Sequence, residues 1–116
     1  MKVLIVEDTD IVAEVFKRYF EKVWEADCII AESNEEAMAA YDPANLDIIT
    51  FDYTIVGGNT EKFLRHVLAT GFTGLILICT EDPDGRDKLM VIGKGRVTPA
   101  SKSPMDWIQT IIIEPK

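Results

Sequence analysis

The chain has 116 residues, of which 47% are hydrophobic, and a formal net charge of −8 at pH 7. This length and composition are sufficient for one domain with an ordinary apolar core. The acidic balance disfavours direct binding to nucleic acid, which needs a basic face. No apolar stretch approaches the roughly 20 residues that span a bilayer, and the chain begins directly with a strand pattern rather than a signal peptide. We therefore expect no membrane segment and a cytoplasmic location.

The first third of the chain has the pattern strand, helix, strand. The apolar run Val3–Val6 predicts a central strand that is covered on both faces. A helix is expected from Thr9 or Asp10, because apolar residues recur at spacings of three and four up to Val23. Cys28–Ala31 then predicts a second, short strand.

The middle of the chain continues the alternation. A capping box at Ser33–Glu36 begins a second helix, whose buried face we expect to hold Ala37, Met38 and Tyr41. An Asp-Pro pair ends that helix, because a residue before proline disfavours the helical conformation. Asp47–Phe51 predicts the third strand.

A loop with two adjacent glycines, Gly57–Gly58, follows the third strand. The apolar stripe of Phe63–Leu68 predicts a third helix, and Leu75–Cys79 is the most apolar strand of the chain. Asp82–Pro83 has the form of a helix cap followed by proline at the first helical position. The fourth helix is expected to be weak, because glycines interrupt it.

The last segment predicts an edge strand and a final helix. Val97–Ala100 is a poor strand because Pro99 lacks a backbone donor, so we expect it at an edge of the sheet. Ser103–Pro104 begins the final helix, with an apolar stripe at Ile108, Ile111 and Ile112. Five alternating strands and helices predict one α/β domain over residues 1–116, with helices on both faces of a parallel sheet.

Polar residues follow the strands of this predicted sheet at the edge where such sheets bind ligands. Glu7 and Asp8 follow the first strand, Asp52 ends the third, Thr80 follows the fourth, and Lys102 lies just past the fifth. Three neighbouring carboxylates repel one another unless a cation is present or one of them is protonated. Mg²⁺ takes oxygen ligands from carboxylates and leaves room for phosphate oxygens. The pattern therefore predicts a Mg²⁺ site suited to phosphoryl transfer onto a carboxylate.

These residues also carry a family resemblance. The runs Val3–Asp8, Asp47–Asp52 and Leu75–Thr80, followed by Lys102, resemble the receiver domain of two-component response regulators in order and spacing. The resemblance covers essentially the whole chain. It implies a flavodoxin-like, doubly wound sheet of five strands in the order 2-1-3-4-5, which a chemotaxis receiver also has.

The resemblance also assigns roles by position. It implies the phosphoacceptor Asp52, the metal-binding acidic pair Glu7 and Asp8, a third protein ligand of the metal from the backbone carbonyl of Thr54, the switch hydroxyl Thr80 and the phosphate-binding Lys102. It implies a phosphorylation-dependent switch rather than an enzyme. The phosphoryl donor would be a histidine kinase or phosphotransfer protein, and the output a downstream partner protein. The switch would be a monomer or a phosphorylation-dependent dimer.

Three positions near the expected site depart from the family pattern. The loop Thr54–Asn59 lacks the usual proline, and Glu81 follows Thr80 where the family has a small residue. The extra carboxylate predicts altered dephosphorylation kinetics. Pro99 falls where the family has an aromatic switch residue, which puts the usual coupling from Thr80 to an aromatic ring in question.

A fourth departure follows the lysine. In the family the lysine directly precedes a proline in a cis bond, whereas here Ser103 stands between Lys102 and Pro104. A cis bond before a residue other than proline costs about 2.5–4 kcal/mol. We therefore expect a re-routed trans loop in preference to a cis Lys102–Ser103 bond.

Two other functions use the same fold. The first is a protein-binding module that works without phosphorylation, which the altered loop and the weak fifth strand favour. The second is a flavin-binding electron carrier. That function is disfavoured because the loop after the first strand, Glu7–Asp10, is acidic and would repel a phosphate group.

Overall fold

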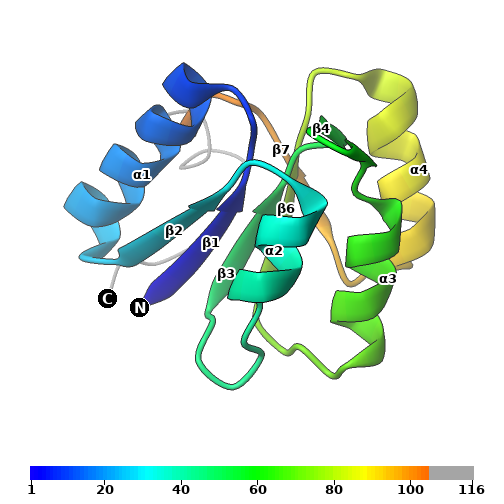
Figure 1. The fold of residues 1–116 in the computed structure, drawn as a ribbon, viewed down its shortest axis with the longest axis horizontal. Helices are drawn as coiled ribbons and strands as arrows, with labels where there is room; N and C mark the ends of the chain where they lie inside the picture. Colours follow the sequence, from blue (N-terminus) through cyan, green and yellow to red (C-terminus); the bar gives the residue numbers. More distant parts are fainter. Residues whose placement is uncertain (105–116) are drawn as a thin grey trace.

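The structure is a computed structural model and describes residues 1–104, so the apolar stripe expected at Ile108, Ile111 and Ile112 lies outside the described residues. Five parallel strands form the sheet, in the order β2-β1-β3-β6-β7 (Figure 1). The strands are β1 (Lys2–Val6), β2 (Asp27–Ala31), β3 (Ile48–Phe51), β6 (Leu75–Cys79) and β7 (Thr98–Ala100). Numbered along the chain, this is the order 2-1-3-4-5, so the predicted fold class is confirmed.

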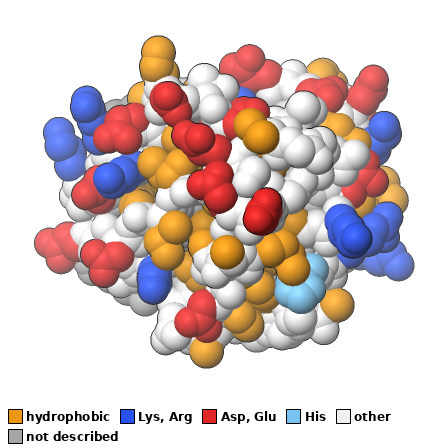
Figure 2. Space-filling view, viewed as in Figure 1, with side chains coloured by type: hydrophobic (Ala, Val, Ile, Leu, Met, Phe, Trp, Pro, Cys, Tyr) orange, Lys and Arg blue, Asp and Glu red, His pale blue; other side chains and the backbone are white. Residues whose placement is uncertain are grey.

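Helices cover both faces of the sheet. The helices are α1 (Asp10–Trp24), α2 (Asn34–Ala40), α3 (Glu61–Ala69) and α4 (Pro83–Gly93). In the described part of the chain, α1 packs on one face and α2, α3 and α4 pack on the other (Figure 1). Asp and Glu side chains run across the middle of the surface that Figure 2 shows. No described helix is both long enough and apolar enough to cross a membrane.

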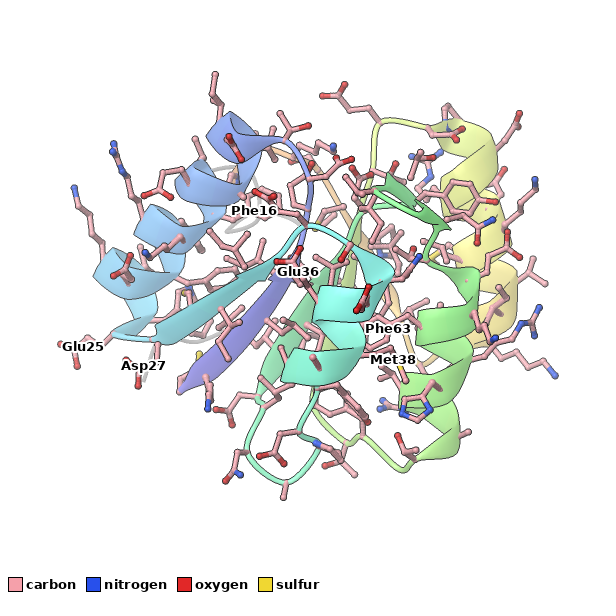
Figure 3. All side chains as sticks on the ribbon, viewed as in Figure 1. Phe16, Glu25, Asp27, Glu36, Met38 and Phe63 are labelled. Atoms are coloured by element: carbon pink, nitrogen blue, oxygen red, sulfur yellow. The ribbon has the colours of Figure 1, made fainter. Side chains whose placement is uncertain are left out.

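The core has two halves because side chains of a strand alternate between its faces. Val3 and Ile5 of β1 pack toward α1, where Phe16 is 1% exposed, whereas Leu4 and Val6 pack toward the opposite helices. Figure 3 shows Phe16 on α1 and Phe63 of α3 on the other side of the sheet. Burial of large aromatic rings on both faces stabilises the layers, since truncation of one such ring to alanine costs roughly 3–5 kcal/mol.

The N-cap of the capping box is confirmed at Ser33, whereas Glu36 Oε2 accepts from the backbone N–H of Glu32 and not from that of Ser33. The Ser33 hydroxyl oxygen accepts a hydrogen bond from the backbone N–H of Glu36 at 3.1 Å. The expected buried face of this helix is correct at Ala37 but wrong at Met38, which is 45% exposed. Adjacent helical residues point about 100° apart, so in this short helix Met38 turns toward solvent when Ala37 faces the core. Val23 at the end of α1 is likewise exposed, and the helix buries Trp24 instead.

The loop after Asp52 contains structure that the sequence analysis missed. Thr54–Ile55 (β4) and Gly58–Asn59 (β5) form a short antiparallel hairpin. Its connection requires glycine, because Gly57 and Gly58 both have positive φ angles, 92° and 119°. The hairpin places α3 directly beside the carboxyl edge of the sheet.

The expected start of α4 and the expected trans bond after Lys102 are both found. Asp82 caps α4 by accepting a hydrogen bond from the backbone N–H of Gly85 at 3.1 Å. Residues 1–104 contain no cis peptide bond, so the Lys102–Ser103 bond is trans, as expected. β7 pairs only with β6 among the described strands, which places Pro99 at an edge of the described sheet.

Candidate functional site

Three carboxylates meet at the carboxyl edge of the sheet. Oxygen atoms of Glu7, Asp8 and Asp52 all lie within 4.8 Å of one another. Neighbouring strands bring them together, because β1 and β3 pair in parallel with Val6 opposite Phe51. The residue that follows each of these two strands therefore emerges at the same point of the edge.

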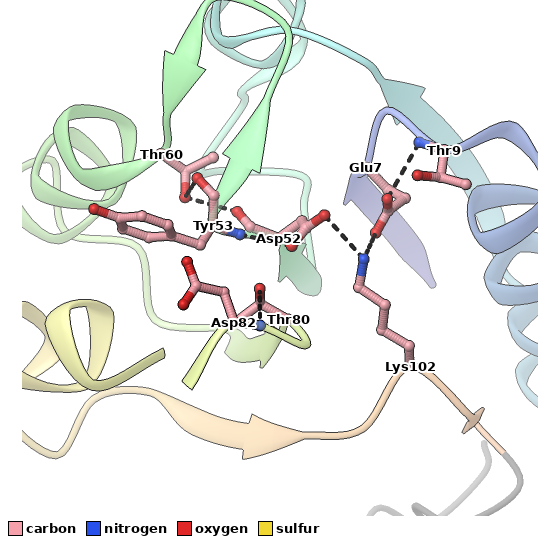
Figure 4. A network of polar contacts seen from close by, with 8 residues as sticks. All are labelled: Glu7, Thr9, Asp52, Tyr53, Thr60, Thr80, Asp82 and Lys102. Carbon is pink, nitrogen blue, oxygen red and sulfur yellow. Dashed lines mark hydrogen bonds and ion pairs between the residues drawn. The ribbon is translucent and has the colours of Figure 1, made fainter. Parts of the chain in front are cut away.

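Lys102 closes this cluster from the side of β7 (Figure 4). Its Nζ lies 3.0 Å from Asp52 Oδ2 and 3.2 Å from Glu7 Oε2. Glu7 is 1% exposed and Asp52 is 7% exposed, so both carboxylates are largely withdrawn from water. One ammonium group thus faces three carboxylates, and the cluster remains short of positive charge.

The charge deficit affects the ionisation of the site. Burial and the neighbouring Asp52 raise the pKa of Glu7, and Lys102 offsets this only in part. Burial lowers the pKa of Lys102, but its contacts with Asp52 and Glu7 outweigh burial, and the net direction is upward. Lys102 is therefore charged at neutral pH and serves as the resident counterion of the cluster.

The donor set fits a magnesium ion. It consists of carboxylate oxygens, the ligand type that Mg²⁺ prefers. Glu7 Oε2 is buried and accepts no hydrogen bond from a described residue, although it lies in ion-pair distance of Lys102. A buried anionic oxygen without a donor is a favourable position for a hard cation or for a water molecule that the cation holds.

Two contacts fix the main chain and carboxylate of Asp52. The backbone N–H of Tyr53 donates to Asp52 Oδ1 at 2.8 Å, and the Thr60 hydroxyl donates to the Asp52 carbonyl oxygen at 2.7 Å. Thr60 has no exposed surface. The sequence analysis did not single out Thr60, and its only local signal is its place before the first residue of α3.

Tyr53 connects the site with two helices. Its hydroxyl donates to Glu61 Oε2 of α3 at 2.5 Å, and this bond, together with burial and the Glu61 charge, raises the pKa of Tyr53 to about 12. Its ring lies against Gly85 of α4, and Lys88 Nζ lies 5.9 Å from the ring centroid. The side chain after Asp52 is therefore in contact with both α3 and α4.

Thr80 and Thr54 are not part of this contact network. The Thr80 hydroxyl oxygen accepts a hydrogen bond from the backbone N–H of Asp82 at 3.2 Å (Figure 4). Thr80 lines an open cleft of about 720 Å³ together with Glu81 and Lys102. Thr54 lies in β4 with an exposed side chain. The structure thus brings together Glu7, Asp8, Asp52 and Lys102, whereas the roles of Thr80 and Thr54 stay predictions.

Comparisons with known proteins identify the fold. No protein-family model matches the sequence, and no curated protein matches it. Among solved structures, the response regulator TrrA from Thermotoga maritima, in complex with Mg(2+)-BeF, has a TM-score of 0.76 at 17% identity over 95% of each chain. The HemR receiver domain from Leptospira biflexa has a TM-score of 0.71 at 21% identity, over 84% of this chain and 80% of that chain.

A third similar structure is a putative response regulator from Chloroflexus aurantiacus, with a TM-score of 0.68 at 23% identity, over 84% of this chain and 83% of that chain. The strand order and the helices on both faces define a doubly wound, flavodoxin-like α/β domain. Within that class, the chain has the fold of the response-regulator receiver domains.

Proposed function

We propose that this protein is a phosphorylation-dependent signalling switch that receives a phosphoryl group on Asp52 with the help of Mg²⁺. One observation carries the proposal: Asp8 and Glu7 converge on Asp52 at the carboxyl edge of the sheet, with Lys102 Nζ 3.0 Å from the Asp52 carboxylate. This arrangement combines a nucleophilic carboxylate, a set of metal ligands and a fixed positive charge.

The proposed reaction is a direct phosphoryl transfer. An Asp52 carboxylate oxygen forms a bond to phosphorus, while the bond from phosphorus to the histidine nitrogen of the donor, or to the oxygen of an acyl phosphate, breaks. Asp8, Asp52, the Thr54 carbonyl and Glu7, directly or through water, would hold Mg²⁺, which would supply positive charge to the phosphoryl oxygens. The TrrA structure, which has the same fold and is in complex with Mg(2+)-BeF, supports magnesium as the cation of the proposed site.

The residues of the chain prepare this reaction before the donor arrives. Lys102 already lies at the carboxylate, so its charge needs no rearrangement to meet the incoming phosphoryl oxygens. The Tyr53 N–H fixes one Asp52 oxygen, and the Thr60 hydroxyl holds the backbone of the same residue. The open cleft beside Thr80 and Lys102 gives the donor access.

Phosphorylation would then change the surface that partners meet. The phosphoryl group adds about −1.5 to −2 charge to an edge that already carries three carboxylates. Thr80 and Lys102 respond as hydrogen-bond donors to the new oxygens, and the loops that carry them move with them. We propose a histidine kinase or phosphotransfer protein as the donor and a partner protein as the output.

Two observations favour a second function, that of a protein-binding module that works without phosphorylation. Thr80 bonds to Asp82 rather than to a residue of the site, and the short strand β7 contains Pro99 and no aromatic residue. The route from a phosphorylated Asp52 to an aromatic switch residue is therefore absent from the described strand.

A mass measurement separates the two functions. The protein is incubated with MgCl₂ and acetyl phosphate, and we expect the mass of one added phosphoryl group, which excess EDTA abolishes. Asp52→Asn is expected to lack the gain. Asp27→Asn, an exposed aspartate at the opposite end of β2 from the site, is expected to retain it. A wild-type protein that gains no phosphoryl group, or that gains it equally in Asp52→Asn, would overturn the proposed switch.

A further inference from the structure

A groove runs between α3 and α4 on the side of the molecule that the proposed phosphorylation chemistry does not use. Two adjoining hollows of about 640 and 320 Å³ share Arg65, Val91 and Ile92, and so form one continuous groove. Lys94 and Arg96 line its far end, beyond the last turn of α4. The capped start of α4 lies next to Thr80. Because α4 has 11 residues, its last turn lies about 16 Å from this start.

The floor of this α3–α4 groove is apolar. Val91 is 72% exposed, and among the large hydrophobic residues of the described chain only Ile11 is more exposed. Leu68 of α3 and Ile92 of α4 contribute partly buried side chains beside it. Position 93 requires glycine because of close packing, since a methyl group there would come within 2.4 Å of the Val97 side chain. The floor is therefore a formed surface on rigid elements.

The rim of the groove is basic on balance in an acidic protein, because Arg65, Lys88, Lys94 and Arg96 line it against Glu61 and Asp87. Residues 1–60 contain four Lys and Arg against thirteen Asp and Glu, whereas residues 61–96 contain six against five. Among the described residues the only ion pairs are those of Lys102, so Arg65, Lys94 and Arg96 have no carboxylate partner there. Figure 2 shows Lys and Arg side chains gathered beside the single histidine, on the side of α3.

We propose that the α3–α4 groove binds an acidic, amphipathic segment of a partner protein. An apolar side chain of the segment packs on Val91 between the helices, and its carboxylates pair with Arg65 and Lys94. The rim cations, which lack carboxylate partners among the described residues, provide the charge complementarity, and the exposed apolar floor provides the anchor. The interaction does not depend on phosphorylation of Asp52, so it can be tested independently of the proposed switch.

Other occupants fit the surface less well. A nucleic acid would bring its phosphate backbone toward a chain of net charge −8. A second copy would have to present a helix such as α1, which exposes Ile11 and Val15. That helix exposes Arg18 and Lys22 among its acidic residues Glu14 and Glu21, so it is not the strongly acidic segment that the rim of the groove favours.

Selection from a random peptide library tests the proposal with the unphosphorylated full chain. We expect the selected peptides to be enriched in Asp and Glu, with apolar residues at spacings of three or four. A selected peptide is then synthesised and titrated by calorimetry. Val91→Asp and Arg65→Glu are each expected to weaken its binding by about tenfold or more. The matched α1 variants, Val15→Asp and Lys22→Glu, are expected to leave binding within about twofold.

Each other result of this experiment overturns the proposal. Selected peptides without an acidic bias would exclude the stated chemistry. Equal binding by wild type, Val91→Asp and the milder variants Val91→Ala and Arg65→Gln would place the peptide elsewhere. Sedimentation of the protein alone as a dimer that Val91→Asp dissociates would assign the groove to a second copy. Circular dichroism and cooperative unfolding of each variant identify any that do not fold, and the milder variants then decide the outcome.

Discussion

The ring of Tyr53 lies against the backbone of Gly85, so closely that a methyl group at Gly85 would come within 2.4 Å of the ring. Tyr53 directly follows Asp52 and donates its N–H to the Asp52 carboxylate. The identity of a residue in α4 is therefore set by the side chain next to the candidate phosphoacceptor. The contact also explains why α4 tolerates a glycine in its first turns, where sequence propensity alone disfavours one.

Gly85→Ala is expected to lower the free energy of unfolding by about 1–3 kcal/mol, because the new methyl group forces the Tyr53 ring to move. Helix propensity alone predicts the opposite sign, a gain of about 1 kcal/mol for alanine over glycine. Urea unfolding measures the difference. Asp87→Ala, an exposed change in the same helix, serves as a control and is expected to change stability by no more than about 0.5 kcal/mol. A Gly85→Ala protein as stable as wild type would contradict the contact.

Asp8→Asn is expected to weaken Mg²⁺ binding by about tenfold or more, because it removes one of the three carboxylates that could hold the ion. Titration calorimetry of the unphosphorylated protein with MgCl₂ gives the affinity directly. Asp27→Asn removes the same charge from an exposed position at the amino end of β2, and its affinity is expected to match wild type. Equal weakening in both variants would indicate a general effect of net charge and not a site.

Glu7→Gln is expected to stabilise the metal-free protein at neutral pH. The pKa of Glu7 is raised in the folded state by burial and by Asp52, so the folded state holds this proton to a higher pH than the unfolded state does. Stability therefore falls as pH rises from the ordinary Glu value of 4.5 through the raised folded value. Each unit of displacement corresponds to about 1.4 kcal/mol.

Urea unfolding in EDTA across this pH range measures the effect. The gain of Glu7→Gln over wild type is expected to be complete above the folded pKa of Glu7 and to disappear below pH 4.5, where Glu7 is protonated in both states. Added MgCl₂ is expected to reduce the gain, since the ion removes the repulsion. A gain that is constant with pH would mean that packing, rather than ionisation, is responsible.

The two cysteines are expected to react very differently in the native protein. Burial and the nearby Glu21 raise the pKa of Cys28 to about 11, whereas Cys79 is 1% exposed and its pKa is raised further by burial. Because the thiolate is the nucleophile, iodoacetamide is expected to label Cys28 slowly at pH 8 and faster toward pH 11. Glu21→Gln is expected to accelerate this labelling. Labelling of Cys79 in the folded protein would contradict its burial.

The sequence predicted the sheet and the acidic cluster through the same reasoning. Continuous apolar runs identify the parallel strands, and the strand order places β1 beside β3, so the residues after Val6 and Phe51 must meet. Lys102 is found at the cluster as well, although Ser103 stands between it and Pro104. The pairing of strands that are distant in sequence can be predicted here because it depends on the order of strands and helices along the chain and not on the details of side-chain packing.

The parts that the sequence did not predict depend on local geometry. The β4–β5 hairpin has two residues in each strand, too few to produce an alternating pattern. Thr60 was missed because its hydroxyl bonds to the Asp52 carbonyl oxygen only after the hairpin has folded back over the edge. Met38 was assigned to the core from its apolar character, but the short helix turns it outward.

The ion pairs of the described residues are confined to Lys102, although the chain contains 20 acidic residues and 12 basic ones. Most surface carboxylates therefore experience the field of like charges at distances comparable to the Debye length, about 10 Å in 0.1 M salt. Dissolved NaCl screens this mutual repulsion, while it weakens few attractive contacts because few exist. We therefore expect ionic strength to stabilise this fold, so that its resistance to urea increases from dilute buffer to concentrated salt.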